Sequence, residues 1–307
     1  MTATKPISVD ICICTFRRAF LNRTLDSISG LNTQHLSIRV IVADNDEAPS
    51  ARQRVEAMAA RLPFPVVYLH APARNISVAR NACLDTATAD YVAFIDDDEL
   101  ASPEWLQALV EVAVKKGSDA VFGPVRAIYD ADAPVWVRRG DFHSTMPVFV
   151  GGRIRTGYTC NVLMRRLPPF SSLRFRTELG QSGGEDTEYF HRFFALGGRF
   201  DYAPAAVVSE PVPVDRARLA WLARRRLRSG QTHGYWLAKA QHGRVAAMAV
   251  AGTKALACLG LAAVSLRSPW RWRQQLLRAT LHVGVVAGLA GMRHAQIYGN
   301  AAPAKTH

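Results

Sequence analysis

Acidic residues are scarce in the last third of this sequence. Residues 211–307 contain 15 lysines and arginines but a single acid, Asp215, whereas residues 1–210 hold 23 lysines and arginines against 24 acids. The last segment therefore has a charge of +14 and the first 210 residues a charge of −1, which together give the net charge of +13. Such a segment attracts nucleic acid, an anionic membrane or a phosphorylated lipid. Its basic residues alternate with long Ala, Val and Leu runs, which nucleic-acid-binding surfaces seldom carry, so we expect no nucleic-acid partner.

Cysteine is also scarce. The chain has five cysteines, an odd number, and none of them shows the paired two-residue spacing of a zinc site. This usage is typical of reduced thiols in a cytosolic protein and argues against a disulfide or zinc scaffold. The first ten residues lack the apolar core of a secretory signal. We therefore expect the first 210 residues to lie in the cytoplasm.

Hydrophobic residues are abundant, at 49% of 307 residues, so the chain can bury a large core. In the first half, short apolar runs alternate with helical stretches, which predicts an α/β fold with a mainly parallel sheet flanked by helices. Near-continuous apolar runs indicate strands that are buried on both faces. The predicted strands are 9–14, 40–43, 66–69, 91–95 and 120–122.

Two helix starts are recognisable between these strands. Ser50 with Gln53 predicts a capping box before a helix at 51–61, and Ser102 followed by Pro103 predicts an N-cap. From about residue 123 to 210, glycine and proline interrupt the pattern, and we expect long functional loops over the sheet. A basic, apolar helical region follows, which divides the chain into domains at 1–210 and 211–307.

Four consecutive acids, Asp96 to Glu99, follow the predicted strand 91–95. In open α/β sheets, ligands bind at this end of the strands. Adjacent carboxylates raise one another's pKa unless a cation neutralises them, and such oxygen-rich clusters favour Mg²⁺ or Mn²⁺. A solvated turn at the end of the strand is the alternative, but the position favours a metal site.

Other strand ends are predicted to lie in the same region. Thr15 and Arg17 follow the first strand, and Asp44 follows the second. Threonine and arginine in such a turn can hold a pyrophosphate, and the aspartate can accept a hydrogen bond from a base or ribose. Taken singly, each of these residues fits an ordinary turn or cap equally well. Asn75 and Arg80 form a third set that we expect to contact the nucleotide, although Asn75 fits an ordinary helix N-cap equally well.

A further pair of acids, Glu185 and Asp186, stands after two glycines at the start of a helical stretch. A carboxylate there removes the proton from an attacking hydroxyl if it lies within hydrogen-bond reach. The alternative is that the acids only stabilise the N-terminus of the helix through its dipole. Glu185 is also a candidate contact for the acceptor.

Taken together, these segments resemble the family-2 glycosyltransferases with the GT-A fold, in order and spacing over residues 7–210. The resemblance implies inverting transfer of a sugar from a nucleoside diphosphate that is held with a divalent metal. It also implies a role for each matching residue: Thr15 and Arg17 contact the nucleotide, Asp44 binds the base, Asp96 reaches the ribose, Asp98 ligates the metal and Asp186 is the catalytic base.

A narrower resemblance covers almost the whole chain. Segments 140–145, 155–161, 182–187 and 228–234 are similar to those of bacterial succinoglycan-biosynthesis glucosyltransferases. This implies a UDP-glucose donor and a growing oligosaccharide on a polyprenyl diphosphate carrier. The chain departs from many relatives at Ser209, which stands where they carry a histidine near the metal.

The basic region suits a membrane surface. Apolar and basic residues alternate from Leu219 onward, as in an interfacial helix, and Arg224, Arg225 and Arg228 are predicted to hold the diphosphate of the acceptor. Residues 245–266 are about as long as a spanning helix, but they carry Lys254 midway, which is costly at a bilayer centre. We therefore expect helices that lie in or dip into the cytoplasmic face of the inner membrane. A spanning helix and a soluble helical subdomain are the alternatives.

Two other functions fit parts of the pattern. A metal-dependent nucleotidyltransferase would share the metal and nucleotide sites but would need further carboxylates for two-metal chemistry, and Asp186 is the only candidate. A basic nucleic-acid-binding protein fits the charge of +13 and the six tryptophans, but the positive segment has no recognisable nucleic-acid-binding motif.

Overall fold

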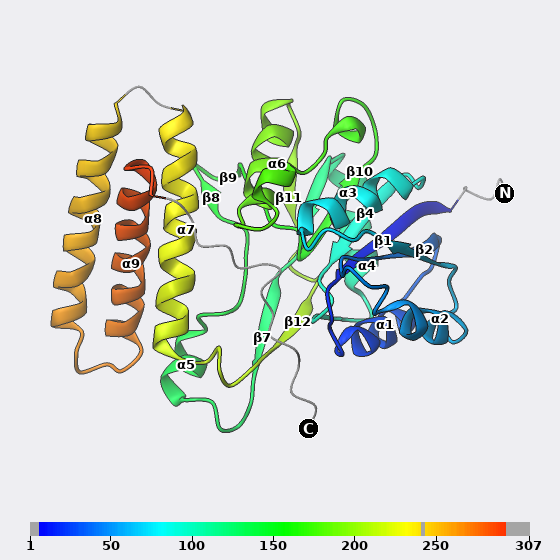
Figure 1. The fold of residues 1–307 in the computed structure, drawn as a ribbon, viewed down its shortest axis with the longest axis horizontal. Helices are drawn as coiled ribbons and strands as arrows, with labels where there is room; N and C mark the ends of the chain where they lie inside the picture. Colours follow the sequence, from blue (N-terminus) through cyan, green and yellow to red (C-terminus); the bar gives the residue numbers. More distant parts are fainter. Residues whose placement is uncertain (1–5, 241–242, 293–307) are drawn as a thin grey trace. The chain divides into compact units, whose positions relative to one another are not determined.

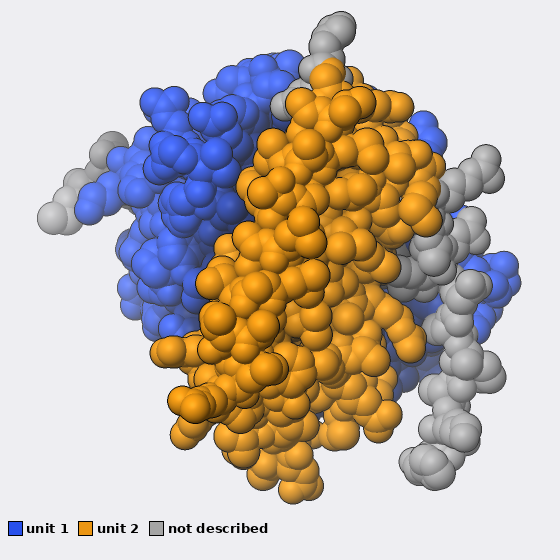
Figure 2. Space-filling model, turned by 90° about the vertical axis from the view of Figure 1, so that its left-hand side faces the viewer, with its two compact units in different colours: residues 1–126, 144–210, 297–307 blue, residues 127–143, 211–296 orange. Residues whose placement is uncertain are grey.

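The computed structural model describes residues 6–240 and 243–292, which divide into two compact units (Figure 2). The first unit comprises residues 6–126 and 144–210 of this described part. The second comprises 127–143 together with the described residues from 211 onward. The predicted second domain, 211–307, extends into residues 241–242 and 293–307, which lie outside the described residues.

The first unit is built on a mainly parallel sheet, as predicted. Within the described residues its seven strands have the order β11-β6-β10-β4-β1-β2-β3 (Figure 1). Strand β10 is antiparallel to both of its neighbours, whereas the β1, β2, β3 and β4 pairings are parallel. The strands are β1 (Ile7–Thr15), β2 (Leu36–Asp44), β3 (Val66–His70), β4 (Tyr91–Ile95), β6 (Ala120–Phe122), β10 (Asn161–Arg165) and β11 (Phe200–Tyr202).

Both faces of the sheet are covered, because alternate side chains of a strand point to opposite faces. In β1, Ile11 and Ile13 join a core cluster that includes Trp105, whereas Cys12 joins the other cluster. The helices that supply these layers are α1 (Leu21–Ser29), α2 (Arg52–Ala59) and α4 (Trp105–Lys116) on one face, and α3 (Ile76–Thr86) and α6 (Glu185–Ala195) on the other. The five predicted strands are confirmed, but β3 is only partly buried because it forms an edge of the sheet.

Both predicted helix caps are wrong. Helix α2 has Ala51 as its N-cap residue, and its methyl group cannot cap. The Ala51 N–H instead donates to Oδ2 of Asp44, at 2.8 Å, so a carboxylate from the strand end replaces the capping box of Ser50. Helix α4 has Glu104 as its N-cap residue, because Ser102 forms a preceding turn in which its carbonyl accepts from the Trp105 N–H, at 2.9 Å.

The expectation that residues 123–210 form long loops is also wrong. The apolar strand β10 lies in the middle of the sheet, between β6 and β4. Asn161 begins it, and its side-chain amide donates to the carbonyls of Pro124 and Ala206. The remaining elements of this part are short: β7 (Val125–Tyr129), α5 (Val135–Gly140), β8 (Phe149–Val150), β9 (Arg153–Ile154), η1 (Phe170–Ser172), η2 (Thr177–Leu179) and β12 (Val208–Val212). The short strand β5 (Leu100–Ala101) precedes this part and pairs with β12.

The second unit contains three long helices, α7 (Leu219–Ala240), α8 (Arg244–Val264) and α9 (Arg271–Leu289), in its described part. Helix α9 packs against both α7 and α8 (Figure 1). Gly230 of α7 faces Gly284 of α9 so closely that an added Cβ at Gly230 would lie 2.0 Å from the Leu281 carbonyl oxygen. The α7 and α9 backbones therefore meet where neither helix has a side chain.

Candidate active site

The ends of β1, β2 and β4 meet at one edge of the sheet, as predicted. Thr15 and Asp44 are register partners at the ends of β1 and β2. The Thr15 hydroxyl donates to Oδ2 of Asp97, at 2.7 Å, which joins the end of β1 to the acids after β4. Parallel register places the carboxyl ends of these strands together, and the hydrogen bond fixes the two loops.

Asp44 is completely buried at this edge. Its Oδ2 accepts from the Ala51 N–H and from the Tyr68 hydroxyl, both at 2.8 Å, and its Oδ1 accepts from the Asp46 N–H at 3.2 Å. These contacts hold the loop after β2 against β3. The role of Asp44 toward a nucleotide base stays a prediction.

Two neighbouring arginines follow β1. Arg17 has left-handed backbone geometry, with φ of 52°, and its Nε donates to Oδ2 of Asp46 at 2.8 Å. Arg18 lies with Nε 3.3 Å from Oδ1 of Asp97 and Nη2 3.3 Å from Oδ2 of Asp98. Sequence analysis does not single out Arg18, although its place beside Arg17 in the turn is a usable signal.

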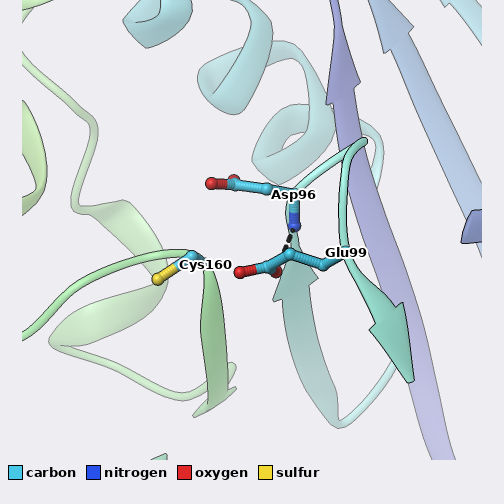
Figure 3. A group of neighbouring side chains, drawn as sticks. All are labelled: Asp96, Glu99 and Cys160. Carbon is cyan, nitrogen blue, oxygen red and sulfur yellow. Dashed lines mark hydrogen bonds between the residues drawn. The ribbon is translucent and has the colours of Figure 1, made fainter. Parts of the chain in front are cut away.

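The acids after β4 form a crowded group. Ligand atoms of Asp96, Glu99 and Cys160 lie within 4.8 Å of one another, and the Asp96 N–H donates to Oε2 of Glu99 at 2.9 Å (Figure 3). Burial raises the pKa of Asp96 to about 7, with Arg80 opposing the shift and Asp98 adding to it. Burial and the charge of Asp96 also raise the pKa of Glu99 well above its usual range.

This group of side chains fits a hard divalent cation. Buried, mutually repelling carboxylates are stabilised by a positive charge, and their oxygens suit Mg²⁺ or Mn²⁺. Cys160 is a poor ligand for such ions, because burial, followed by the charges of Glu99 and Asp96, raises the pKa of its thiol well above the usual value. The predicted ligand, Asp98, belongs to the same run of acids and lies against Arg18.

The segment that departs from the resembling family runs along β12. Ser209 pairs with Leu100 of β5. The charge of the next residue, Glu210, adds to the raised pKa of Asp96, after burial and the other acids, and to that of Glu99, after burial and Asp96. Glu210 therefore belongs to the acid group, and the sequence offers one signal for it, its place directly after Ser209.

The second candidate group lies at the N-terminus of α6. Nη1 of Arg80, from α3, contacts Oε1 of Glu185, and both side chains are nearly buried. Burial opposes the charge of Arg80, but the carboxylates of Glu185, Asp96 and Asp186 raise its pKa. Arg80 therefore interacts with an acid of α6 directly and with an acid of the β4 loop through its charge.

Asp186 occupies the first turn of α6. Its Oδ1 accepts from the Thr187 N–H, at 2.6 Å. Burial, reinforced by the charge of Glu185 and opposed by Arg80, raises the pKa of Asp186 to about 6. Such a carboxylate is ionised near neutral pH and still basic enough to accept a proton. Gly184, with φ of 90°, supplies the left-handed turn before it.

Asn75 is the N-cap of α3. Its Oδ1 accepts from the Ser77 and Val78 N–H groups, and its Nδ2 donates to the Thr177 carbonyl at 2.8 Å. The capping alternative is therefore confirmed. A contact between Asn75 and a nucleotide stays a prediction.

The predicted diphosphate contacts lie in the second unit. Arg224, Arg225 and Arg228 all fall in the first half of α7. The guanidinium of Arg225 lies over the Trp221 ring, 5.4 Å from its centroid. Their binding of a diphosphate stays a prediction.

Comparison with known proteins gives one family. Residues 10–178 match the model of glycosyl transferase family 2. The chain is 50% identical over 297 residues to the succinoglycan biosynthesis protein ExoM of Rhizobium meliloti (strain 1021). This alignment covers 95% of this chain and 96% of that protein. It is also 28% identical over 136 residues to the glucosyl-dolichyl phosphate glucuronosyltransferase of Haloferax volcanii, covering 43% and 41% of the two chains.

Solved structures share the fold. The mannosyltransferase PcManGT from Pyrobaculum calidifontis, in complex with GDP-Man and Mn²⁺, aligns with a TM-score of 0.63 and 19% identity over 93% of this chain and 88% of that one. The S. aureus TarS fragment 1–349 aligns with a TM-score of 0.53 and 15% identity over 93% and 92%. At these identities the likeness establishes the fold alone.

Proposed function

We propose, from the premise that this chain belongs to glycosyl transferase family 2, that it transfers glucose from UDP-glucose to an oligosaccharide carried on a polyprenyl diphosphate. The observation that carries the proposal is that Arg80 pairs with Glu185 and that the charges of both Asp96 and Asp186 raise its pKa. This supports a proposal in which Asp96 belongs to the donor site and Asp186 is the general base. The sequence identity of 50% over nearly the whole length of ExoM supports a role in succinoglycan-like exopolysaccharide synthesis.

The nucleotide lies across the strand ends in this proposal. Thr15 and Arg17 contact its phosphates, Asp44 binds the base and Asp96 the ribose, with Asn75 and Arg80 as further contacts. Asp98, with Glu210 of the same acid group, would hold a Mg²⁺ or Mn²⁺ ion, which would supply positive charge against the diphosphate. Arg18 already places a fixed cation beside Asp98.

Asp186 acts as the general base. Its carboxylate removes the proton of the acceptor hydroxyl, whose oxygen then forms a bond to the anomeric carbon. The bond between that carbon and the UDP oxygen breaks on the opposite side, and UDP leaves with the bonding electrons. One such in-line displacement converts an α-linked donor into a β-glycoside.

The acceptor is held by its charge and its lipid. Arg224, Arg225 and Arg228 suit a diphosphate because a guanidinium binds phosphate oxygens with paired N–H groups. Glu185 is a candidate for an acceptor hydroxyl, since among the described residues its Oε2 has no hydrogen-bond partner. The basic region would hold the enzyme on the cytoplasmic face of the inner membrane.

The test is a transfer assay. Purified protein is incubated with Mg²⁺ or Mn²⁺, a panel of radiolabelled UDP-sugars and a membrane-lipid extract, and both labelled lipid and UDP are measured. We expect labelled lipid from UDP-glucose alone, with one UDP released per sugar transferred. Labelling from another UDP-sugar would show that the donor is that sugar nucleotide. A parallel incubation with a nucleoside triphosphate tests the nucleotidyltransferase alternative, which would release pyrophosphate and against which family membership argues.

A further inference from the structure

Helix α8 has an unusual distribution of side chains. Its buried positions are small residues, Ala251, Ala255, Cys258 and Ala262, which recur at intervals of four, three and four and therefore share one face. Its exposed positions include large apolar residues: Val245 and Val264 are 80% exposed and Leu256 is 70% exposed. The helix of a water-soluble domain normally has the reverse arrangement, with large apolar side chains inside.

The exposed residues form a continuous surface along the helix. We define the outer face of α8 as the exposed large apolar residues Val245, Val250, Leu256, Leu259, Leu261 and Val264. Within the described part of the chain, α8 is the one helix that is long and apolar enough to cross a membrane, and only 22% of its most apolar window is buried. Soluble proteins rarely leave so large an apolar patch in contact with water.

Polar groups on α8 are compatible with lipid contact. The Thr253 hydroxyl donates to the Ala249 carbonyl at 2.9 Å, so it needs no water. Lys254 is exposed, three residues after the buried Ala251 and one before the buried Ala255. Burial, followed by the charge of Lys254, lowers the pKa of both His233 in α7 and His282 in α9. Its long side chain is therefore on the flank of α8 and away from the centre of the outer face.

Aromatic and cationic residues stand at both ends of the apolar stretch. Lys239, near the end of α7, has its Nζ 4.6 Å from the Tyr235 ring centroid. After α8, the guanidinium of Arg271 lies 5.3 Å from the Trp270 centroid. Such pairs are typical of the interface between lipid headgroups and acyl chains.

The charge of the helical segment favours an anionic partner. Residues 216–307, which include α7, α8 and α9, contain no acid, and the four acids of the second unit, Asp130, Asp132, Asp141 and Asp215, lie outside these helices. A second copy of this surface would bring two strongly positive units together, whereas an anionic bilayer attracts them. A bilayer also offers an apolar phase for the outer face.

We propose that the outer face of α8 lies in the bilayer surface, with the helix parallel to the membrane plane. A spanning α8 would carry its partner α9 into the hydrocarbon, and α9 brings Arg271, Arg273 and Arg278 with it. A helix lying in the interface buries the outer face and leaves these arginines near the phosphates. The inference deepens the proposed function, because a polyprenyl-linked acceptor is embedded in a membrane.

The test is flotation of the full chain with vesicles of phosphatidylcholine containing 30% phosphatidylglycerol. The Leu256→Gln/Val264→Gln variant changes no charge and replaces exposed residues, so folding should persist. We expect at least tenfold weaker vesicle binding, since each lost apolar contact accounts for about a factor of ten. The control Val114→Gln/Leu196→Gln replaces a valine and a leucine of the first unit that are 56% and 47% exposed, and it should bind as the wild type does.

Several outcomes would overturn the inference. If the wild-type protein does not bind the vesicles, or if the double variant binds them as tightly as the wild type does, the outer face of α8 does not contact the bilayer. A dimer in sedimentation that the α8 variant abolishes, with vesicle binding unchanged, assigns the face to a second copy. Resistance of the cellular protein to carbonate extraction points to a spanning helix. UDP binding is measured for every variant, so that failure of the surface is distinguished from failure of the proposed transferase.

Discussion

Arg80 of α3 and Glu185 of α6 form an ion pair whose side chains are 8% and 5% exposed. The two residues are 105 positions apart in the sequence. The Arg80 guanidinium also lies 5.5 Å from the Phe175 ring centroid. The pair connects the two helices that cover one face of the sheet and stands directly beside Asp186.

Removal of Arg80 should therefore destabilise the protein. In Arg80→Met, Glu185 is left buried without its cation, and we expect the free energy of unfolding to fall by about 3–5 kcal/mol. Urea denaturation measures this change. The control Arg61→Met removes an exposed ion pair with Asp26 and should change stability by less than about 1 kcal/mol.

The double variant Arg80→Met/Glu185→Met separates stability from function. It removes both charges, so much of the lost stability should return, while transfer activity should stay low because Arg80 no longer balances Asp96 and Asp186. Recovery of full activity in the double variant would show that the pair is structural alone.

Replacement of the proposed base should affect turnover and spare donor binding. Asp186→Asn keeps the shape of the side chain but cannot accept the proton, so we expect kcat to fall by about 10² to 10⁴. Single-turnover transfer and UDP-glucose titration give the two quantities. Asp85→Asn, an exposed aspartate in α3, is the matched control. Turnover near the wild-type value would assign the base to Glu185 or another residue.

The pH dependence of kcat should follow Asp186. Because burial raises its pKa to about 6, the ionised base is present above that pH and is lost as the pH falls through it. We expect kcat to be level above about pH 7 and to fall tenfold per pH unit well below 6. A rate profile between pH 4.5 and 8, at saturating donor and metal, checks this. A profile that stays level down to pH 4.5 would contradict the assignment.

Metal-dependent donor affinity should depend on the acids after β4. Asp98→Asn removes a charge that holds the cation, so calorimetry with UDP and Mn²⁺ should show affinity at least tenfold weaker, approaching the value without metal. Glu210→Gln should cause a smaller loss in the same direction. Unchanged affinity in Asp98→Asn would remove this residue from the metal site.

The contact between α7 and α9 should tolerate no side chain. Gly230→Ala forces a methyl group against the Leu281 carbonyl, and we expect a loss of about 1–3 kcal/mol in stability. Gly252→Ala in α8 is the control, because no described heavy atom outside its own helix lies within 4 Å of the added carbon. That variant should gain up to about 1 kcal/mol from helix propensity. Equal effects of the two changes would argue against the close approach of the helices.

Local patterns in the sequence determined much of the first unit. Continuous apolar runs predicted the strands at 9–14, 40–43 and 91–95, because all side chains of such a segment are removed from water only in a sheet that is covered on both faces. The acids from Asp96 to Glu99 could be placed at the ligand-binding edge for the same reason, since the strand before them ends there. The family followed from motifs whose order is itself a property of the sequence.

Tertiary structure decided what depends on distant partners. Strand β10 entered the centre of the sheet through pairing with β4 and β6, although its short apolar run gave little local signal. Arg80 met Glu185, and Glu210 joined the acid group, only because helices and strands far apart in sequence pack together. The outer face of α8 became visible only when packing on α9 took the small residues inside. Periodicity fixes which residues share a face, but only packing fixes which face is covered.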